Sequence, residues 1–166
     1  MDIELVDSKV GRGTQFDVFI PIHGGHVESD SEESSRPIYD AGRKRILFVD
    51  AERSILDLAK ISLEKSGYDV TVFEDSRLAL EAFRKDPDEY DILVTDQTMP
   101  GLVGSDLAKA VLEIRPGLPV ILCSGYSKAI SEDMADSMGI KGYLFKPVSR
   151  EVLSNTIRQI FEARAA

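Results

Sequence analysis

From residue 45 onward, short apolar runs alternate along the chain with longer segments of mixed polarity. Each run is short enough to be a strand and lacks a polar alternate face, as expected of strands that are buried on both sides in a parallel sheet. The runs that we interpret as strands are Arg45–Asp50, Asp69–Phe73, Ile92–Asp96, Pro119–Ser124 and Gly142–Phe145. Several of the segments between them place apolar residues three and four positions apart, and the predicted helices are Ser54–Ser66, Arg77–Lys85, Asp106–Arg115, Ile130–Met138 and Arg150–Ala163.

This alternation predicts one doubly wound α/β domain, with five helices around a five-stranded parallel sheet. Helix-terminating residues stand where two helices are expected to end, at Gly67 and at Pro116–Gly117. In the strand order 2-1-3-4-5, counted within this domain, the first and third strands are neighbours. Their carboxyl ends then flank the crevice in which such sheets bind ligands.

The amino-terminal part of the chain has a different pattern. Two strand-like runs, Ile3–Val6 and Gln15–Ile22, lie on either side of Gly11–Thr14 and predict a single hairpin. Residues 24–36 carry several serines and carboxylates with Val27 as their only large apolar residue, a composition that cannot offset the entropy of ordering. We therefore expect a hairpin at residues 1–22, a flexible acidic linker at residues 23–43 and the α/β domain at residues 44–166.

Four polar residues stand at the carboxyl ends of the expected strands. Asp50 closes the first strand, Asp96 the third and Ser124 the fourth. Lys146 follows the fifth. Two adjacent carboxylates would repel each other unless a cation lay between them, and carboxylate oxygens suit Mg²⁺. Taken singly, each residue has an ordinary interpretation as a helix cap, a turn former or a surface charge, but their convergence on one edge favours a phosphoryl-transfer site.

Composition limits the classes of partner. The formal net charge is −9, with both signs interspersed, which argues against binding to nucleic acid or to an anionic membrane surface. No stretch is long and apolar enough for a signal peptide or a membrane span, so the expected location is the cytoplasm. The single cysteine, Cys123, lies in an apolar run and is interpreted as a core residue. The oligomeric state cannot be inferred from the sequence.

Three segments resemble the signature segments of receiver domains, the phospho-accepting modules of two-component signalling. They are Val49–Glu52, Asp96–Gly101 and Gly142–Pro147, and they occur in the order and spacing of that family. Pro119–Ser124 resembles the strand that carries the switch hydroxyl. The resemblance covers about residues 45–161 and implies a flavodoxin-like fold.

The resemblance also implies a role for each candidate residue. Asp96 would accept a phosphoryl group from a phosphohistidine, and Lys146 would contact that group. Ser124 would then hydrogen-bond to the phosphoryl group, and Tyr143 would rotate inward behind it, which would switch a protein-interaction face. The peptide bond between Lys146 and Pro147 is expected to be cis, as is usual in this family.

The expected metal site departs from the family pattern at one position. The resemblance implies that Mg²⁺ is bound by Asp50, Asp96 and the backbone carbonyl of Thr98, but the second of two adjacent acids is Ala51 in this chain. This loss predicts that Mg²⁺ affinity is at least about 10-fold weaker, unless Glu52 reaches the metal instead. Two functions stay open: a phosphorylatable receiver, and a degenerate receiver that binds a protein without phosphorylation.

The amino-terminal run Ser8–Pro21 resembles the closing strands of a histidine-kinase ATP-binding domain. A kinase tail, a linker and a receiver is the order at the end of a hybrid sensor histidine kinase, so we interpret the chain as such a fragment. It lacks the histidine-bearing helix and the nucleotide-binding motifs, and it is not expected to use ATP. The expected partner is a histidine-bearing dimerisation or phosphotransfer helix. Leu56 and Leu63 are candidates for docking it, although core packing explains most of that apolar stripe equally well.

A third class, a flavodoxin-like redox protein, shares the expected fold. Such a protein would need a phosphate-binding loop rich in hydroxyl groups after the first strand. The acids Asp50 and Glu52 stand at that place and would repel a flavin phosphate, which argues against this class.

Overall fold

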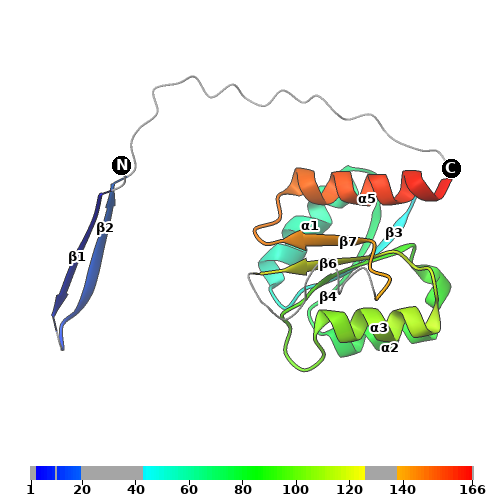
Figure 1. Cartoon of the computed structure of the whole chain (residues 1–166), viewed down its shortest axis with the longest axis horizontal. Coiled ribbons are helices and arrows are strands. Elements are labelled where there is room, and N and C mark those ends of the chain that lie inside the picture. Colours follow the sequence, from blue (N-terminus) through cyan, green and yellow to red (C-terminus); the bar gives the residue numbers. More distant parts are fainter. Residues whose placement is uncertain (1–2, 10, 20–42, 126–137, 166) are drawn as a thin grey trace, which may run out of the picture. The chain divides into compact units, whose positions relative to one another are not determined.

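A computed structural model of the chain describes residues 3–9, 11–19, 43–125 and 138–165. The chain divides into two compact units, Met1–Ser35 and Arg36–Ala166. Each unit is described by itself (Figure 1).

The first unit contains the predicted hairpin. Strands β1 (Ile3–Lys9) and β2 (Gly13–Phe19) pair in antiparallel fashion, with Ile3 opposite Phe19. The turn is closed by a hydrogen bond from the backbone N–H of Arg12 to the carbonyl of Lys9, at 2.9 Å. Gly11 and Gly13 have φ values of 79° and 95°, a conformation that favours glycine, so the two strands extend closer to the turn than the sequence suggested. The predicted end of the second strand, residues 20–22, lies outside the described residues.

The second unit is built on the predicted parallel sheet. Its strands are β3 (Arg45–Val49), β4 (Asp69–Phe73), β5 (Ile92–Asp96), β6 (Val120–Ser124) and β7 (Gly142–Phe145). They pair in the order β4-β3-β5-β6-β7, and every pairing is parallel. Within this unit the order reads 2-1-3-4-5, so the predicted topology is confirmed. The expected bounds of three strands are also reproduced without change.

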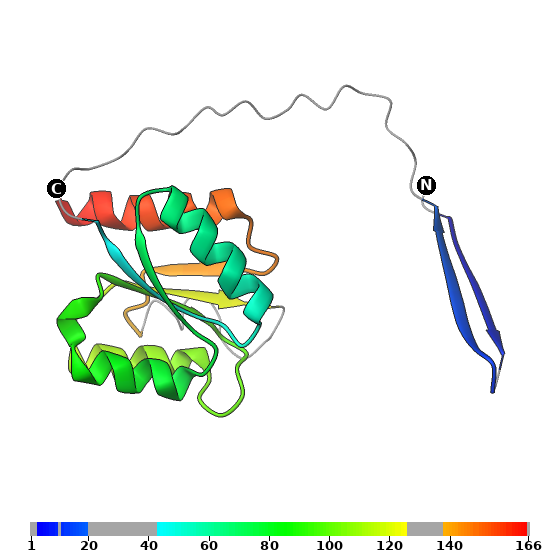
Figure 2. The same cartoon turned by 180° about the vertical axis from the view of Figure 1, so that it is seen from behind.

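Helices cover both faces of this sheet. The described helices are α1 (Arg53–Lys65), α2 (Ser76–Lys85), α3 (Gly104–Ile114) and α5 (Arg150–Ala165), together with the 3₁₀ turn η1 (Pro87–Glu89). Figures 1 and 2 show α2 and α3 side by side on one face and α1 and α5 on the other. The predicted helix Ile130–Met138 lies outside the described residues except for Met138, which is in a turn. The flavodoxin-like fold follows from the sheet and its two helical layers.

The alternation of side chains along the strands divides the core into two halves. Leu47 and Val49 of β3 face α2 and α3, where they join a cluster that includes Phe83 and Leu107. The neighbouring residue Phe48 faces the opposite way, into a second cluster formed with α1 and α5. Burial on both faces explains why these strands read as continuous apolar runs.

Helix α3 begins two residues earlier than the sequence predicted. The backbone N–H of Gly104, its first residue, donates to the carbonyl of Gln97 at 3.1 Å, which ties the start of the helix to the segment that follows β5. Glycine is unfavourable inside a helix, and the apolar spacing placed the start of this helix at Asp106. The contact with the end of β5 overrides that propensity.

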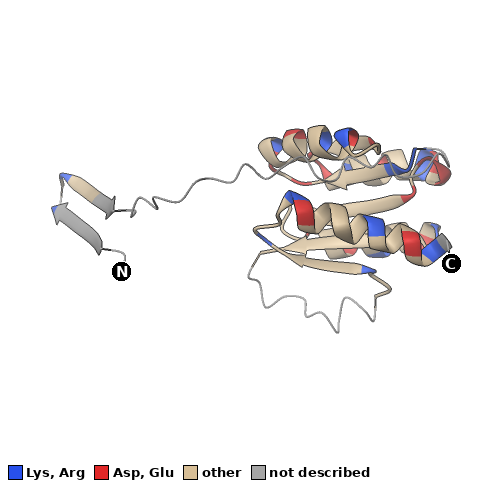
Figure 3. Ribbon diagram, turned by 90° about the horizontal axis from the view of Figure 1, so that it is seen from above, with Lys and Arg blue, Asp and Glu red and all other residues tan. Residues whose placement is uncertain are grey.

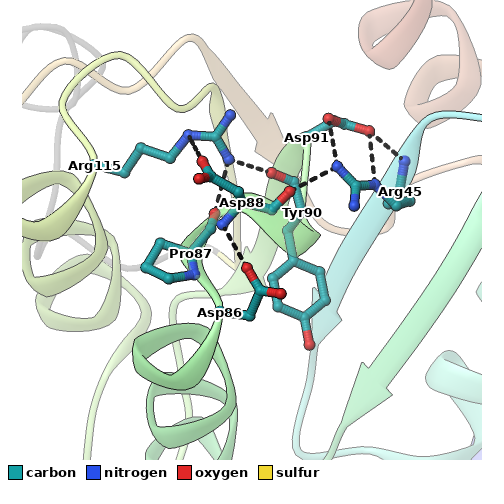
Figure 4. A network of polar contacts seen from close by, with 7 residues as sticks. All are labelled: Arg45, Asp86, Pro87, Asp88, Tyr90, Asp91 and Arg115. Carbon is teal, nitrogen blue, oxygen red and sulfur yellow. Dashed lines mark hydrogen bonds and ion pairs between the residues drawn. The ribbon is translucent and has the colours of Figure 1, made fainter.

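A polar network stabilises the edge of the sheet where the strands begin (Figure 4). Arg45 at the start of β3 pairs with Asp91, with a shortest N–O distance of 3.3 Å between the two charged groups. Arg115, just beyond α3, donates to the backbone carbonyls of Pro87 and Tyr90 at 2.8 and 2.6 Å. These bonds hold the η1 segment against both β3 and the end of α3.

Charges of both signs are spread along the helices of the second unit. Figure 3 shows Lys and Arg positions alternating with Asp and Glu positions along them, and several of these positions form pairs at i,i+4 spacing. Acidic and basic side chains are thus interspersed along these helices. Among the described helices, none has the length and apolar character needed to cross a membrane.

Candidate functional site

Two buried aspartates lie next to each other at the carboxyl edge of the sheet. Asp50 follows β3 directly and Asp96 is the last residue of β5, the strand that pairs with β3. Their exposed fractions are 3% and 6%. A buried carboxylate costs folding free energy unless it is paired with a positive charge or a metal ion. Both aspartates should therefore have such a partner.

The partner that the structure supplies is the ammonium group of Lys146. Its Nζ lies 2.8 Å from Oδ2 of Asp50 and 3.0 Å from Oδ1 of Asp96. The backbone N–H of Lys146 donates to the carbonyl of Ser124 at 2.8 Å, which fixes the residue as β7 ends. The Lys146–Pro147 peptide bond is cis, as the family resemblance implied.

Burial and charge act in opposite directions on the acids and the lysine. Burial raises the pKa of Asp96, the hydrogen bond and charge of Lys146 oppose that effect, and the charge of Asp50 reinforces it; the net pKa lies above its ordinary value. Burial lowers the pKa of Lys146, but its bonds to Asp50 and Asp96 outweigh that effect and the net pKa is raised. The lysine therefore keeps its positive charge beside a carboxylate that is destabilised in its ionised form.

The residues at this edge fit a partly hydrated magnesium ion. Mg²⁺ commonly binds one or two carboxylates and keeps several waters, and Asp50 and Asp96 provide that number. Glu52 is not brought to them, because its carboxylate accepts a hydrogen bond from the Ser54 hydroxyl at 2.6 Å. Within the described part of the chain, no three acidic, histidine or cysteine side chains gather closely enough to hold a metal by themselves. The position that lacks an acid, Ala51, is exposed.

The two predicted switch residues belong to strands β6 and β7. Ser124 ends β6 and is fully buried, and its hydroxyl donates to the carbonyl of Gly125 at 2.9 Å. Tyr143 on β7 is half-buried and packs against the core, and its ring meets that of Phe145 edge to face at 5.1 Å. The structure thus brings together three of the predicted site residues and leaves these two beside them.

The segment between Asp96 and α3 contains contacts that the sequence interpretation missed. Gln97 is only 7% exposed and is hydrogen-bonded to Ser105 through both polar atoms of its amide. Gly104 packs so closely against the Asp96 backbone that a Cβ atom would collide with its carbonyl oxygen. An isolated glycine in a helical pattern is a known signal of close backbone approach and could have identified this position.

A cavity of about 520 Å³ is lined by residues of both α1 and α5 and by the two aspartates. Its walls are mainly apolar, and Asp50, Asp96 and Lys146 line one end. Of the two interpretations of Leu56 and Leu63, docking is wrong and core packing is confirmed, because both side chains are fully buried in the core. They lie seven positions apart on the helix face that packs against the sheet.

Three apolar side chains of α1 and α5 are exposed. Leu58 lines the cavity and is 69% exposed. Ile61 on α1 and Val152 in the first turn of α5 are exposed as well. The apolar surface available to a partner is therefore offset from the apolar stripe that forms the core.

Cys123 behaves as a core residue. It is buried in the cluster between the sheet and α1 and α5. Burial raises the pKa of its thiol to about 12, so the reactive thiolate form is disfavoured.

A flavodoxin-like sheet with paired aspartates and a lysine at its carboxyl edge defines a class of α/β domains suited to accept a phosphoryl group. The model of the response regulator receiver domain family matches residues 46–158 of the chain. The chain belongs to this family, and its function is that of a receiver domain in two-component phosphorelay signalling.

Individual relatives agree with this assignment. The response regulator receiver protein CpdR of Brucella abortus is 30% identical over 120 residues, which cover 72% of this chain and 98% of that protein. The sensor protein EvgS of Escherichia coli K12 is 28% identical over 158 residues, which cover 95% of this chain. The chain spans only 13% of the length of EvgS and 17% of that of the sensor kinase CckA of Brucella abortus.

Solved structures show the same relationship. The crystal structure of a response regulator receiver domain protein from Clostridium thermocellum superposes with a TM-score of 0.69 at 30% sequence identity. The superposition covers 74% of this chain and 97% of the Clostridium thermocellum chain. Receiver domains are generally dependent on Mg²⁺, and those of hybrid kinases interact with histidine kinase and phosphotransfer partners.

Proposed function

We propose that Asp96 is the phospho-acceptor and receives its phosphoryl group from a phosphohistidine. The observation that carries this proposal is the contact of Lys146 Nζ with Asp96 Oδ1, at 3.0 Å, on the edge of the sheet where ligands bind. In the proposed step a carboxylate oxygen of Asp96 attacks the phosphorus atom while the bond from phosphorus to the histidine nitrogen breaks. The products are an acyl phosphate and a free histidine.

The charged residues around Asp96 have distinct roles in this step. Lys146 neutralises part of the charge on the transferring oxygens and leaves its contact with Asp50 or Asp96 to reach them. Asp50, Asp96 and the backbone carbonyl of Thr98 would hold Mg²⁺, which supplies further neutralisation of the same oxygens. Glu52 would contribute to the metal only after releasing its bond to Ser54.

The switch residues would act after transfer. The Ser124 hydroxyl would exchange its bond to the Gly125 carbonyl for one to a phosphoryl oxygen. Movement of Ser124 would leave space that the Tyr143 ring fills by rotating inward. Because Tyr143 contacts Phe145, which is exposed, this rotation would alter the surface at the end of β7.

We assign the partner to the cavity between α1 and α5. A histidine-bearing helix placed there would present its imidazole to Asp96 at the polar end of the cavity. Leu58, Ile61 and Val152 would provide apolar contacts with such a helix. The partner would be the dimerisation helix of a histidine kinase or a histidine phosphotransfer protein.

We also propose that the chain is the carboxyl-terminal part of a cytoplasmic region of a hybrid sensor histidine kinase. Residues 1–22 would be the last hairpin of the ATP-binding domain, residues 23–43 a linker and residues 44–166 the receiver. The match to EvgS extends over 95% of the chain and so includes part of the hairpin, which supports this division. A degenerate receiver, suggested by Ala51, is the less favoured alternative because Asp50, Asp96 and Lys146 are all retained in contact.

The proposal is tested by a magnesium titration followed by phosphorylation. Amide shifts near Asp50 and Asp96 are expected to saturate at millimolar Mg²⁺, and acetyl phosphate or beryllofluoride should then shift the resonances of Asp96 and Tyr143. Asp96→Asn is the control that must abolish the second response. A protein that shows neither response would act as the degenerate module instead.

A further inference from the structure

The side-chain amide of Gln97 is buried and hydrogen-bonded to the start of helix α3. Gln97, the residue after Asp96, has all of its polar groups paired. Its backbone N–H donates to the carbonyl of Cys123 at 2.7 Å, and its carbonyl accepts from Gly104 at 3.1 Å. Its side-chain Oε1 accepts from the backbone N–H of Ser105 at 3.0 Å, and its Nε2 donates to the Ser105 hydroxyl at 3.2 Å.

The amide of Gln97 takes the place of a missing helix cap. The first backbone N–H groups of a helix have no partner within the helix and are usually satisfied by the side chain of the N-cap residue. The N-cap residue of α3 is Val103, which provides no such bond. Gln97 reaches across the loop and accepts from Ser105 instead, so the start of α3 is fixed to the end of β5.

The loop between these points is fixed from a second side. Ser76 at the start of α2 is buried, and its hydroxyl donates to the carbonyl of Leu102 at 2.6 Å. The guanidinium of Arg77 lies against Gly101, which has a φ of 83°. Bonds at both ends leave the intervening peptides little freedom to rotate.

Thr98 is the residue whose backbone this arrangement orients. Its backbone N–H acts on the carboxylate of Asp96, whose pKa it lowers, and the residue is exposed. Because Gln97 is held through its backbone and its side chain, the peptide that joins it to Thr98 is held in one orientation. The Thr98 carbonyl proposed as a Mg²⁺ ligand belongs to the next peptide, and its placement matters more here because position 51 carries Ala rather than an acid.

We propose that Gln97 and Ser105 form a positioning clamp for the Thr98 backbone, and that this clamp sets the geometry of the phospho-acceptor site. The clamp deepens the proposed function and rests on it for its biological meaning. The restraint that the clamp places on the Thr98 peptide exists without metal, so it is measured in the metal-free protein. Neither residue contacts a reacting atom, so both are positioning residues.

The test compares variants that remove the clamp with a matched control. Gln97→Met preserves side-chain length while removing both amide bonds, and Ser105→Ala removes the hydroxyl alone. Ser62→Ala, at a buried position on α1, is the control. In metal-free protein, hydrogen exchange at the Thr98 amide is expected to be about 10-fold faster in Gln97→Met and less affected in Ser105→Ala, with no change at Val94 in β5.

A conservative variant separates positioning from general destabilisation. Gln97→Glu keeps an acceptor for the Ser105 N–H and is expected to restore most of the slow exchange at Thr98. The Mg²⁺ dissociation constant should rise about 10-fold in Gln97→Met and return toward the wild-type value in Gln97→Glu. If Gln97→Met does not fold, Ser105→Ala and Gln97→Glu still report on the same amide.

The outcomes distinguish this proposal from the proposed function. Unchanged exchange at Thr98 in folded Gln97→Met, or an equal change in Ser62→Ala, would overturn the clamp. A wild-type protein that binds no Mg²⁺ would instead contradict the proposed metal-dependent function, and the exchange at Thr98 would still decide whether the clamp exists.

Discussion

The ammonium of Lys146 lies 2.8 Å from the carboxylate of Asp50, although 96 positions separate the two residues in the chain. The strands that carry them are not neighbours in the sheet, because β5 and β6 lie between β3 and β7. The contact therefore depends on the length of the lysine side chain and on the correct assembly of the whole sheet. It also brings a positive charge to Asp96, which lies on the intervening strand β5.

Removal of this charge should disable the site while the fold persists. In Lys146→Met the hydrogen bond and charge that lower the pKa of Asp96 are lost, so that pKa should rise further above its ordinary value. Phosphorylation by acetyl phosphate should slow by about 100-fold or more, the usual effect of removing a charge-stabilising donor. Carboxyl NMR titration and phosphorylation rates measure the two effects. Lys141→Met, at an exposed position before β7, should leave both unchanged.

Asp96→Asn should stabilise the protein at neutral pH while abolishing phosphorylation. The folded-state pKa of Asp96 is raised above the ordinary value of 3.8, so the ionised carboxylate disfavours folding once the pH exceeds that value. The stabilisation by Asn should be complete above the folded-state pKa and disappear as the pH falls below the unfolded-state pKa. Urea unfolding across this pH range measures it. Equal stability of variant and wild type at neutral pH would show that Lys146 fully compensates for the buried charge.

Much of the fold could be predicted because strand burial and helix periodicity are local signals. Three strands of the sheet were bounded correctly, and the carboxyl-edge positions of Asp50, Asp96 and Lys146 followed from the topology. The proximity of these residues could be inferred from the parallel sheet alone. Their direct contact could not, because it depends on the rotamer and reach of Lys146.

The contacts that organise the loop after Asp96 were not predictable from local pattern. Gln and Ser are residue types usually found at the surface, so the sequence does not predict that Gln97 and Ser105 are buried. In the fold they are buried together and hydrogen-bonded to each other. The same limitation affected Leu56 and Leu63. Periodicity correctly grouped them on one face of α1, but it could not show that the sheet covers this face completely.

Gly104→Ala should destabilise the receiver and disturb Asp96. The added Cβ would meet the Asp96 carbonyl and the side chain of Leu122, so either α3 or the end of β5 must move. Overpacking of this kind typically costs about 1 to 3 kcal/mol of unfolding free energy. Denaturant unfolding measures the loss, and amide shifts at Asp96 report the displacement. Gly125→Ala is a suitable comparison, because nothing lies within 4 Å of a Cβ at that position and little change is expected.

The network at the opposite edge should contribute to stability in a pH-dependent manner. Burial raises the pKa of Asp91, but the hydrogen bonds from Arg45 outweigh this effect and the net pKa is lowered. The stabilisation is therefore present above the unfolded-state pKa and is lost as the pH falls through the lower folded-state pKa. In Asp91→Asn this part of the pH dependence should vanish, as measured by urea unfolding at several pH values.

Ala51→Asp should strengthen Mg²⁺ binding, because position 51 adjoins Asp50 and is exposed at the edge of the site. A third carboxylate should lower the Mg²⁺ dissociation constant by at least about 10-fold, as judged from the cost of losing metal-site partners. Amide-shift titration with Mg²⁺ measures the affinity, and Ala51→Asn controls for side-chain size without the charge. If neither variant binds Mg²⁺ more tightly than the wild type does, the residue at position 51 does not limit the Mg²⁺ affinity. Other groups would then already bind Mg²⁺ in place of an acid at position 51. Glu52 is the first candidate, and the Mg²⁺ affinity of Glu52→Gln tests it.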